Sequence, residues 1–366
     1  MKVMAAPELR ARLHGAAVRS GPAGEADREA SAALRASGLL GTAVPVRHGG
    51  TGGDAAEVNR VVEEIASVNP SAAIIAFQHF AVSARICEWG SAEQQERLLP
   101  LLADGTWLAA SAWSETGAGA AKRNLASTGE RLGDGRWVLN GSKTFTTGAG
   151  LADVYLVLVQ TSEPGPGTQE YGADGQSFFL VPADNPGLVP ELGLGLAGMR
   201  GSATGLIALR DCAVADADRL GPEGRAASII AGVRESGASL GTVSAGIARA
   251  ALDLGVRHAR DRGLMDLPTV RHRLVELATR VEAVRAVVGR AGARVSADPG
   301  LSTLHSKLYA SVAAEEICLE VARMLGSAGY REGAPIGRLL ADARGIAFMG
   351  PTNDLCRDLV AASWTR

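Results

Sequence analysis

The chain has 366 residues, which is too long for one compact core, and domains of about 150 residues predict two or three units. Apolar residues make up 46% of the sequence and charged residues 21%, a balance that indicates a globular protein and excludes a largely disordered one. The formal net charge is -2, and Lys and Arg are scattered among Asp and Glu. We therefore expect no nucleic-acid partner.

The four cysteines lie far apart and lack the spacing of a metal site or a redox pair. Reduced, buried thiols of a cytoplasmic protein are the expected state. No segment reaches the roughly 20 uncharged apolar residues that a bilayer requires. The sequence therefore predicts a cytoplasmic protein with no metal site, no export signal and no membrane anchor.

The first hundred residues have helical patterns. Apolar residues recur at i, i+3, i+4 and i+7 within 54–66, on one face of a helix. The segment 71–86 is apolar nearly all round, which predicts a buried helix in which His79 needs a hydrogen-bond partner. Ser91 and Gln94 have the spacing of a capping box and predict the start of a further helix.

The next hundred residues change to alternation and turn dipeptides. Asp-Gly at 134–135 and Asn-Gly at 140–141 both favour tight hairpins, because these residues tolerate positive φ. Short β-branched runs at 154–160 and 177–181 predict further strands of an antiparallel domain. The segment 163–176 is rich in Gly, Pro and polar residues, which predicts a long surface loop.

The helical period then returns and continues to the end of the chain. Long helices joined by short links predict a helix bundle. They are expected at 226–262, 269–295, 301–325 and 334–362, the last interrupted by a Gly-Pro dipeptide. The fold class is thus α+β, with an N-terminal helical domain at 1–107, a middle antiparallel β domain at 108–221 and a C-terminal four-helix bundle at 222–366.

Particular strings stand at the joins of these domains. They read GLLGTAVPVRHGGTGG at 38–53, GSAEQQERLLPLLADG at 90–105, SAWSETGAG at 111–119, LNGSKTFTTG at 139–148, GMRGSATGLIALRDCAV at 198–214 and LGSAGY at 325–330. In this order the sequence resembles the acyl-CoA dehydrogenase superfamily of flavoproteins over nearly the whole chain. The resemblance implies FAD as cofactor and a homodimer or homotetramer in which FAD lies at a subunit interface.

The resemblance also assigns residues to the cofactor. An isoalloxazine ring needs an aromatic wall and polar groups at its edge. Phe145 stands where the family places an aromatic against the flavin, Thr147 where a hydroxyl meets N5, and Trp113 with Ser114 along the pyrimidine edge. The remaining implied FAD contacts are Gly119 and Thr352 and, from a neighbouring subunit, Arg262 and Gly326.

The sequence departs from the family pattern in three places. Ala120 and Ala121 replace a Ser-Asp pair whose hydroxyl helps to hold phosphate, and the residues at 265–266 replace a Phe-Gly pair that contributes adenine-side contacts. The largest departure is at 349–352, which reads Met-Gly-Pro-Thr where the family has Tyr-Glu-Gly-Thr. Gly350 therefore occupies the position of the carboxylate that removes a proton α to the thioester carbonyl.

The leading hypothesis keeps dehydrogenation of an acyl thioester, bound to CoA or to an acyl carrier protein in a specialised, biosynthetic pathway, and moves the base. Some relatives place the base on the first bundle helix, where Glu235 is the candidate; a solvated glutamate at a helix end is the alternative interpretation of the same residue. If Glu235 faced the flavin, burial would raise its pKa towards that of a useful base. A separate electron acceptor is then required.

Two other functions stay open. The second is a flavin-dependent monooxygenase that receives reduced flavin from a separate reductase and uses oxygen on a small molecule; it needs a dry pocket and a hydrogen-bond donor, and Thr146, Thr147 and His79 would suit it. The third is a non-catalytic scaffold, which the retained flavin contacts disfavour.

Overall fold

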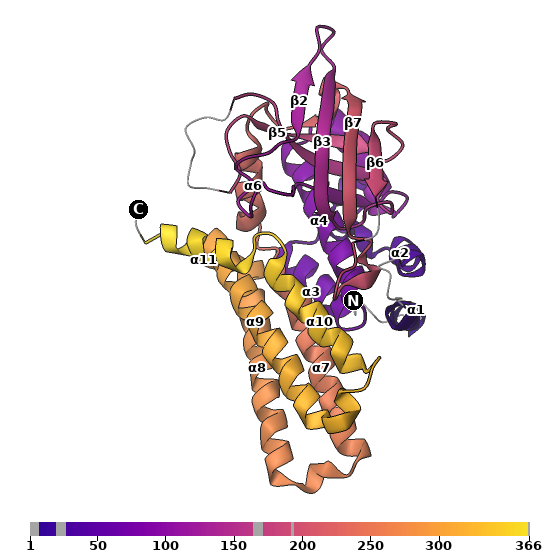
Figure 1. Ribbon diagram of the computed structural model, residues 1–366, viewed down its shortest axis with the longest axis vertical. Helices are drawn as coiled ribbons and strands as arrows, with labels where there is room; N and C mark the ends of the chain where they lie inside the picture. The colour runs from indigo at the N-terminus through magenta and orange to yellow at the C-terminus, as the bar shows by residue number, and fades with distance from the viewer. Residues whose placement is uncertain (1–6, 20–26, 164–170, 192–193, 365–366) are drawn as a thin grey trace.

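The computed structural model describes residues 7–19, 27–163, 171–191 and 194–364. Figure 1 shows the strands gathered at one end of the molecule, a bundle of long C-terminal helices at the other, and the N-terminal helices beside the junction. The α+β class and the three-part organisation predicted from the sequence are confirmed. The divisions expected after residues 107 and 221 stay predictions; both positions fall outside the regular elements.

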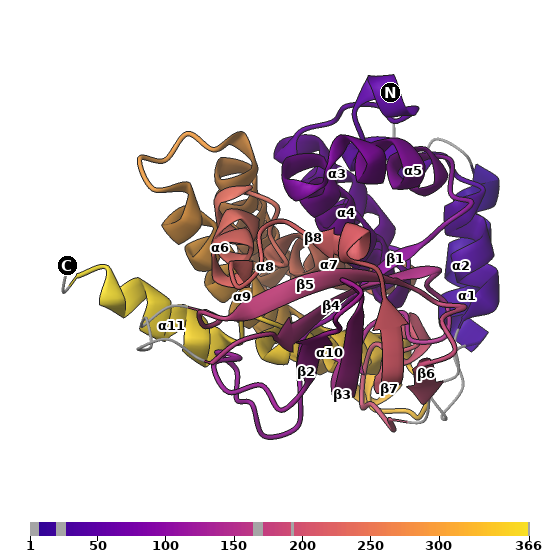
Figure 2. The same cartoon turned by 90° about the horizontal axis from the view of Figure 1, so that it is seen from above.

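The N-terminal helices form where the sequence predicts them. Asp54 caps the helix predicted at 54–66 by accepting a hydrogen bond from the Glu57 amide, and both hydrogen bonds of the Ser91–Gln94 capping box are present. The helices are α1 (Pro7–Arg19), α2 (Arg28–Arg35), α3 (Ala55–Ala66), α4 (Pro70–Trp89) and α5 (Ala92–Ala103). The view along the long axis shows α4 next to the sheet, with α3 and α5 further out (Figure 2).

His79 of the buried helix α4 has two backbone partners. Its Nδ1 accepts a hydrogen bond from the Ala109 amide at 3.2 Å, so Nε2 carries the proton and donates to the Leu40 carbonyl, also at 3.2 Å. Burial lowers the pKa of His79 to about 4, because the charged imidazolium would lose its hydration. A neutral histidine therefore ties α4 to the first strand.

The sheet has eight strands in the order β6-β7-β3-β2-β4-β5-β8, and β1 pairs with β4. Most neighbours are antiparallel, but β1 runs parallel to β4, as does the short β2–β4 contact. One face packs against α4 and α5, and the other has its own apolar core around Trp137. The strands are β1 (Ala109–Ala112), β2 (Thr128–Arg131), β3 (Trp137–Thr146), β4 (Val154–Gln160), β5 (Gln176–Pro182), β6 (Leu188–Glu191), β7 (Gly205–Val214) and β8 (Arg219–Leu220).

Two of the expected turns differ in outcome. The Asp-Gly dipeptide at 134–135 joins β2 to β3 as a hairpin, which confirms the prediction. The hairpin expected at 140–141 is wrong: these residues lie inside β3, at a register shift against β7. Gly141 has a φ of +136°, and a Cβ there would overlap Ser127. Glycine is therefore needed here for a β-bulge and for the close packing of Ser127 on the backbone, not for a chain reversal.

The loop expected at 163–176 is only partly described, since 164–170 lie outside the described residues. Its end is not a surface loop. Tyr171 and Gln176 are both buried: Tyr171 packs into the apolar core between the sheet and the helices, and the Gln176 side chain donates to the Lys122 carbonyl.

The C-terminal part is a four-helix bundle of α7 (Gly241–Asp261), α8 (Pro268–Ala293), α9 (Pro299–Leu325) and α10 (Pro335–Phe348), flanked by α6 (Ala226–Glu235) and α11 (Asn353–Ala362). The single helix expected at 226–262 is in fact two. Gly237 has a φ of +84°, and a Cβ there would crowd the Ala291 carbonyl, so the chain turns between α6 and α7. The break expected after α10 is present.

Among the described residues no helix is long and apolar enough to cross a membrane, and no group of His, Cys, Asp and Glu side chains has the geometry of a metal site. The four cysteines are unpaired thiols. Burial raises the pKa of Cys318 furthest of these, since its thiolate would be the least hydrated.

Candidate active site

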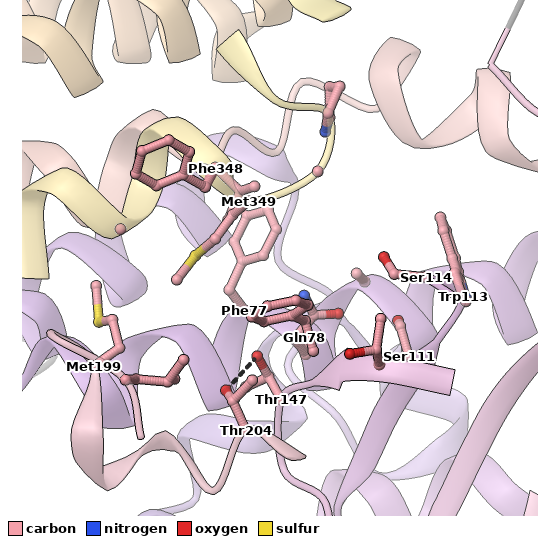
Figure 3. A pocket seen from close by; sticks show the side chains of 18 of the residues that line it. Phe77, Gln78, Ser111, Trp113, Ser114, Thr147, Met199, Thr204, Phe348 and Met349 are labelled. Carbon is pink, nitrogen blue, oxygen red and sulfur yellow. Dashed lines mark hydrogen bonds between the residues drawn. The ribbon is translucent and has the colours of Figure 1, made fainter. Parts of the chain in front are cut away.

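A cavity of about 520 Å³ lies where the sheet, α4, α6 and the turn between α10 and α11 meet. Its size is that of a typical small-molecule site, and most of its surface is apolar. Figure 3 shows Phe348 and Met349 on one side of this space, Ser111, Trp113 and Ser114 on the other, and Phe77 of α4 between them. Segments from all three regions of the chain therefore build one site.

Phe145 forms an aromatic wall of the cavity. It stands in β3 where the pairing with β7 shifts register, and its φ is +51°, a region that bulky residues rarely adopt. Its side chain is 62% exposed. A strained backbone that holds a large aromatic ring open at a cavity indicates a binding surface for a flat ring.

Polar groups stand at the edge of the same wall. Thr147 and Thr204 share a hydrogen bond of 3.2 Å between their hydroxyls, drawn as a dashed line in Figure 3. Ser111 and Ser114 line the same edge, and within the described part of the chain the buried indole Nε1 of Trp113 has no hydrogen-bond partner. Buried donors are normally paired, so this edge is suited to a polar ligand.

The segment with Gly198 and Met199 forms an apolar part of the cavity lining, and one carboxylate fastens it to α10. The Met199 amide donates to Asp342 of α10, and a Cβ at Gly198 would overlap the Ala341 carbonyl, so the segment before β7 lies tightly on α10. Burial raises the pKa of Asp342 to about 6. Asp342 does not line the cavity; it positions Met199, which does.

The charged side chains that reach the cavity are all basic. Lys122, Arg234 and Arg344 line it, and no Asp or Glu of the described residues does. Gly350 is part of the lining and brings no side chain. Among the described residues, no other carboxylate in the cavity therefore replaces the one that is missing at Gly350.

Glu235, the base expected from the sequence, is not in the cavity. It is the last residue of α6, its side chain is exposed, and it lines a separate depression beside Trp89 and Arg225. The preceding residue Arg234 reaches the cavity instead, because successive residues of a helix point about 100° apart. The structure therefore corrects the placement of Glu235 and supports the alternative of a solvated residue at a helix end.

The other expected cofactor residues fall into two groups. Trp113, Ser114, Phe145 and Thr147 line the cavity together. The second group does not line it: Thr352 caps α11 with its hydroxyl next to the cavity turn, Gly119 is an exposed residue with a φ of +69°, and Arg262 and Gly326 end α7 and α9 at the far end of the bundle.

A buried ion pair behind the cavity was not foreseen. Lys143 of β3 is fully buried and bonded to Glu115, which also accepts hydrogen bonds from the amides of Ala126 and Ser127. Burial lowers the pKa of Lys143 to about 8, and the Glu115 charge opposes that effect. The pair fastens the segment 115–127 to the strand that carries Phe145. Sequence spacing alone gives no signal for it.

The chain matches three family models, described as the N-terminal, middle and C-terminal domains of acyl-CoA dehydrogenase, at residues 9–106, 110–212 and 227–365. The chain belongs to the acyl-CoA dehydrogenase family, whose members are FAD-dependent oxidoreductases.

Three relatives illustrate the similarity. Cyclohexane-1-carbonyl-CoA dehydrogenase of Geobacter metallireducens is 31% identical over 96% of this chain and 93% of its own. L-prolyl-[peptidyl-carrier protein] dehydrogenase of Pseudomonas fluorescens is 29% identical over 89% and 87%. The solved structure of glutaryl-coenzyme A dehydrogenase with glutaryl-CoA has a TM-score of 0.85, 25% identity, and coverage of 98% of this chain and 93% of that one.

The cavity wall fits the flavin ring of FAD. Phe145 offers an aromatic face, and the hydroxyls of Ser111 and Ser114, with the unpartnered indole N–H of Trp113, offer hydrogen bonds to the polar edge of the ring. Thr147 stands on the same wall with its hydroxyl already positioned by Thr204. When bound, FAD supplies a two-electron acceptor; the protein supplies binding and orientation.

Proposed function

We propose that this protein oxidises an acyl thioester, carried by CoA or by a carrier protein, to the α,β-unsaturated thioester. The observation that supports this proposal is the make-up of the cavity: Phe145 and Thr147, which suit a flavin ring, line the same space as the apolar side chains of Phe348 and Met349. Figure 3 shows Phe348 and Met349 across this space from Trp113 and Ser114. A flat, apolar acyl group suits this space. Relatives that act on CoA-bound and on carrier-bound substrates support the thioester class.

The residues of this chain have three tasks in that reaction. Phe145 and Thr147 fix the plane and the edge of the bound cofactor. Phe348 and Met349 press the acyl group against that plane, which keeps the two reacting carbons close to it. The apolar lining excludes water, so that charge developing on the substrate is met by fixed groups of the protein and not by solvent.

We infer further that FAD is completed across a subunit interface in a homodimer or homotetramer. Arg262 is exposed at the end of α7, and Gly326, with a φ of +60°, ends α9 at the same end of the bundle (Figure 1). Neither lines the cavity of its own chain. Their position suits contacts with the adenine half of FAD bound to another copy, while Gly119 and Thr352 serve the nearer phosphates.

The experiment is anaerobic mixing of the FAD-loaded protein with a panel of thioesters of different acyl chains, on CoA and on phosphopantetheinylated carrier protein. Loss of the visible flavin absorbance, with formation of the enoyl thioester by mass spectrometry, is the expected result for at least one member. No bleaching by any thioester, together with rapid oxygen-dependent hydroxylation by the pre-reduced protein, would replace dehydrogenation by monooxygenation. Sedimentation of the loaded protein tests the oligomer.

A further inference from the structure

Two side chains occupy the place where the missing carboxylate would stand. A Cβ built on Gly350 would lie 2.9 Å from the Tyr171 hydroxyl and 3.8 Å from the Lys122 ammonium. Tyr171, Lys122 and Gly350 all line the cavity. The glycine is therefore not simply a lost side chain, because the room it leaves is taken by a phenol with an ammonium beside it.

The two segments that carry these side chains are fastened to each other. The amide of Gly172 donates to the Ala121 carbonyl at 2.8 Å. The fully buried Gln176 bridges the segments, with its amide group donating to the Lys122 carbonyl at 2.8 Å and its carbonyl accepting from the Ala173 amide at 3.0 Å. The backbone segments that carry Tyr171 and Lys122 are thus held together by one backbone hydrogen bond and two bonds of the Gln176 side chain.

Lys122 is an unusual cation. It is 5% exposed, its φ is +53°, and its ammonium makes one long hydrogen bond of 3.4 Å to the Ala120 carbonyl. In the described part of the chain it has no carboxylate partner, and it lies 5.1 Å from the centre of the Tyr171 ring. A buried ammonium favours negative charge on a neighbouring group, and Tyr171 is the ionisable neighbour that lines the cavity beside it.

Elimination leads to the same residue. The ionisable side chains that line the cavity are Tyr171 and three basic groups, Lys122, Arg234 and Arg344. A guanidinium does not release its proton in a protein and cannot act as a base. Of the two ionisable groups that remain among the described lining residues, the Tyr171 hydroxyl lies nearer than the Lys122 ammonium to the Cβ position of Gly350, at 2.9 Å against 3.8 Å.

We propose that Tyr171 is the catalytic base of this enzyme and that Lys122 holds it as the phenolate. This assignment rests on the proposed thioester dehydrogenation. The α C–H bond of the thioester breaks and its proton bonds to the Tyr171 oxygen. The electron pair left on the α carbon forms the C=C bond as the β carbon loses its hydride to FAD, so the substrate is oxidised by two electrons.

The first test compares Tyr171→Phe with wild type, using a thioester that bleaches the flavin. Tyr171→Phe keeps the ring against Lys122 and removes only the hydroxyl, so the Kd for FAD should not change. The rate of anaerobic flavin reduction should fall by about 100-fold or more, the usual contribution of a general base. Tyr309→Phe, which changes a tyrosine outside the cavity, is the matched control and should keep the wild-type rate.

The second test does not depend on activity. The flavin-free protein is titrated with alkali, and phenolate absorbance in the near ultraviolet is compared between wild type and Tyr171→Phe. The difference should be one tyrosine that ionises below the ordinary value of about 10. Lys122→Met should move that ionisation upward and slow flavin reduction, while Lys122→Arg should restore part of both.

The third test returns a carboxylate to its family position. In the double variant Gly350→Glu, Tyr171→Ala, the smaller residue at 171 makes room for the new side chain. Flavin reduction should recover relative to Tyr171→Ala alone, and its pH profile should move to lower pH because a carboxyl group ionises near about 4.

The outcomes separate the two proposals. Flavin reduction by Tyr171→Phe at the wild-type rate, or a difference titration without an early phenolate, overturns the role of Tyr171 and leaves thioester dehydrogenation standing. An early phenolate in a protein that no thioester reduces supports the Tyr171–Lys122 pair and overturns its proposed reaction.

Discussion

The neutral His79 should make the fold sensitive to acid. The folded-state pKa of His79 is about 4, whereas an unfolded histidine titrates near about 6.5. At higher pH both states are neutral and the group contributes nothing to the pH dependence. As the pH falls from about 6.5 to about 4, only the unfolded chain takes up the proton, so stability is lost over that window.

The size of this loss follows from the shift. The full window corresponds to about 3 kcal/mol, and the part between about pH 7.5 and about pH 5 to roughly 2 kcal/mol. Other groups also titrate here, among them Asp342, so the comparison needs a matched variant. His79→Gln keeps a polar side chain between the Leu40 carbonyl and the Ala109 amide but cannot be protonated in this range.

The assay is urea unfolding of wild type and His79→Gln at both pH values, followed by tryptophan fluorescence. The variant should be less stable than wild type near neutrality and should lose about 2 kcal/mol less on acidification. Parallel pH dependences of the two proteins would refute the reasoning, because they would mean that His79 is protonated equally in the folded and unfolded chains.

Three further predictions concern the cavity walls. Phe145→Ala should raise the Kd for FAD about 10-fold, the worth of one aromatic contact, in a titration of the flavin-free protein; an unchanged Kd would place the ring elsewhere. Lys143→Met should cost about 3–5 kcal/mol of unfolding free energy because it strands the buried Glu115 charge, and adding Glu115→Gln should recover most of it; a stable single variant would mean that the pair is not desolvated. Gly198→Ala should lower the Tm, since its methyl group would overlap the Ala341 carbonyl, whereas Gly337→Ala in helix α10 meets open space and should not lower the Tm.

Local sequence patterns predicted helix starts and hairpins well where a few neighbouring residues determine the backbone conformation. The capping box of Ser91 and the Asp-Gly hairpin at 134–135 depend on neighbouring residues, and both are present. The Asn-Gly dipeptide at 140–141 has the same local signal but lies inside β3, because pairing with β7 and the approach of Ser127 outweigh the turn preference. Tertiary pairing, which no local pattern shows, decided that case.

The site divides in the same way. Phe145 and Thr147 follow from a continuous string and line the cavity as expected. Glu235 was misplaced because a shift of one residue on a helix turns a side chain by about 100°. Tyr171 gave no signal at all, since its segment has the composition of a surface loop and is buried by packing against parts of the chain that are distant in sequence.

The segment that bears Tyr171 belongs to the β domain, as do Lys122 and the flavin wall at Phe145. Gly350, where the family carries its carboxylate, belongs to the helical bundle. A base on the β domain instead of the helical bundle changes what a movement between these two parts of the molecule would do. Any sliding or tilting of the bundle against the sheet shifts the acyl wall at Phe348, while the distance between base and cofactor stays constant. Substrate shape can then change by adjusting the packing of two domains without disturbing the chemistry.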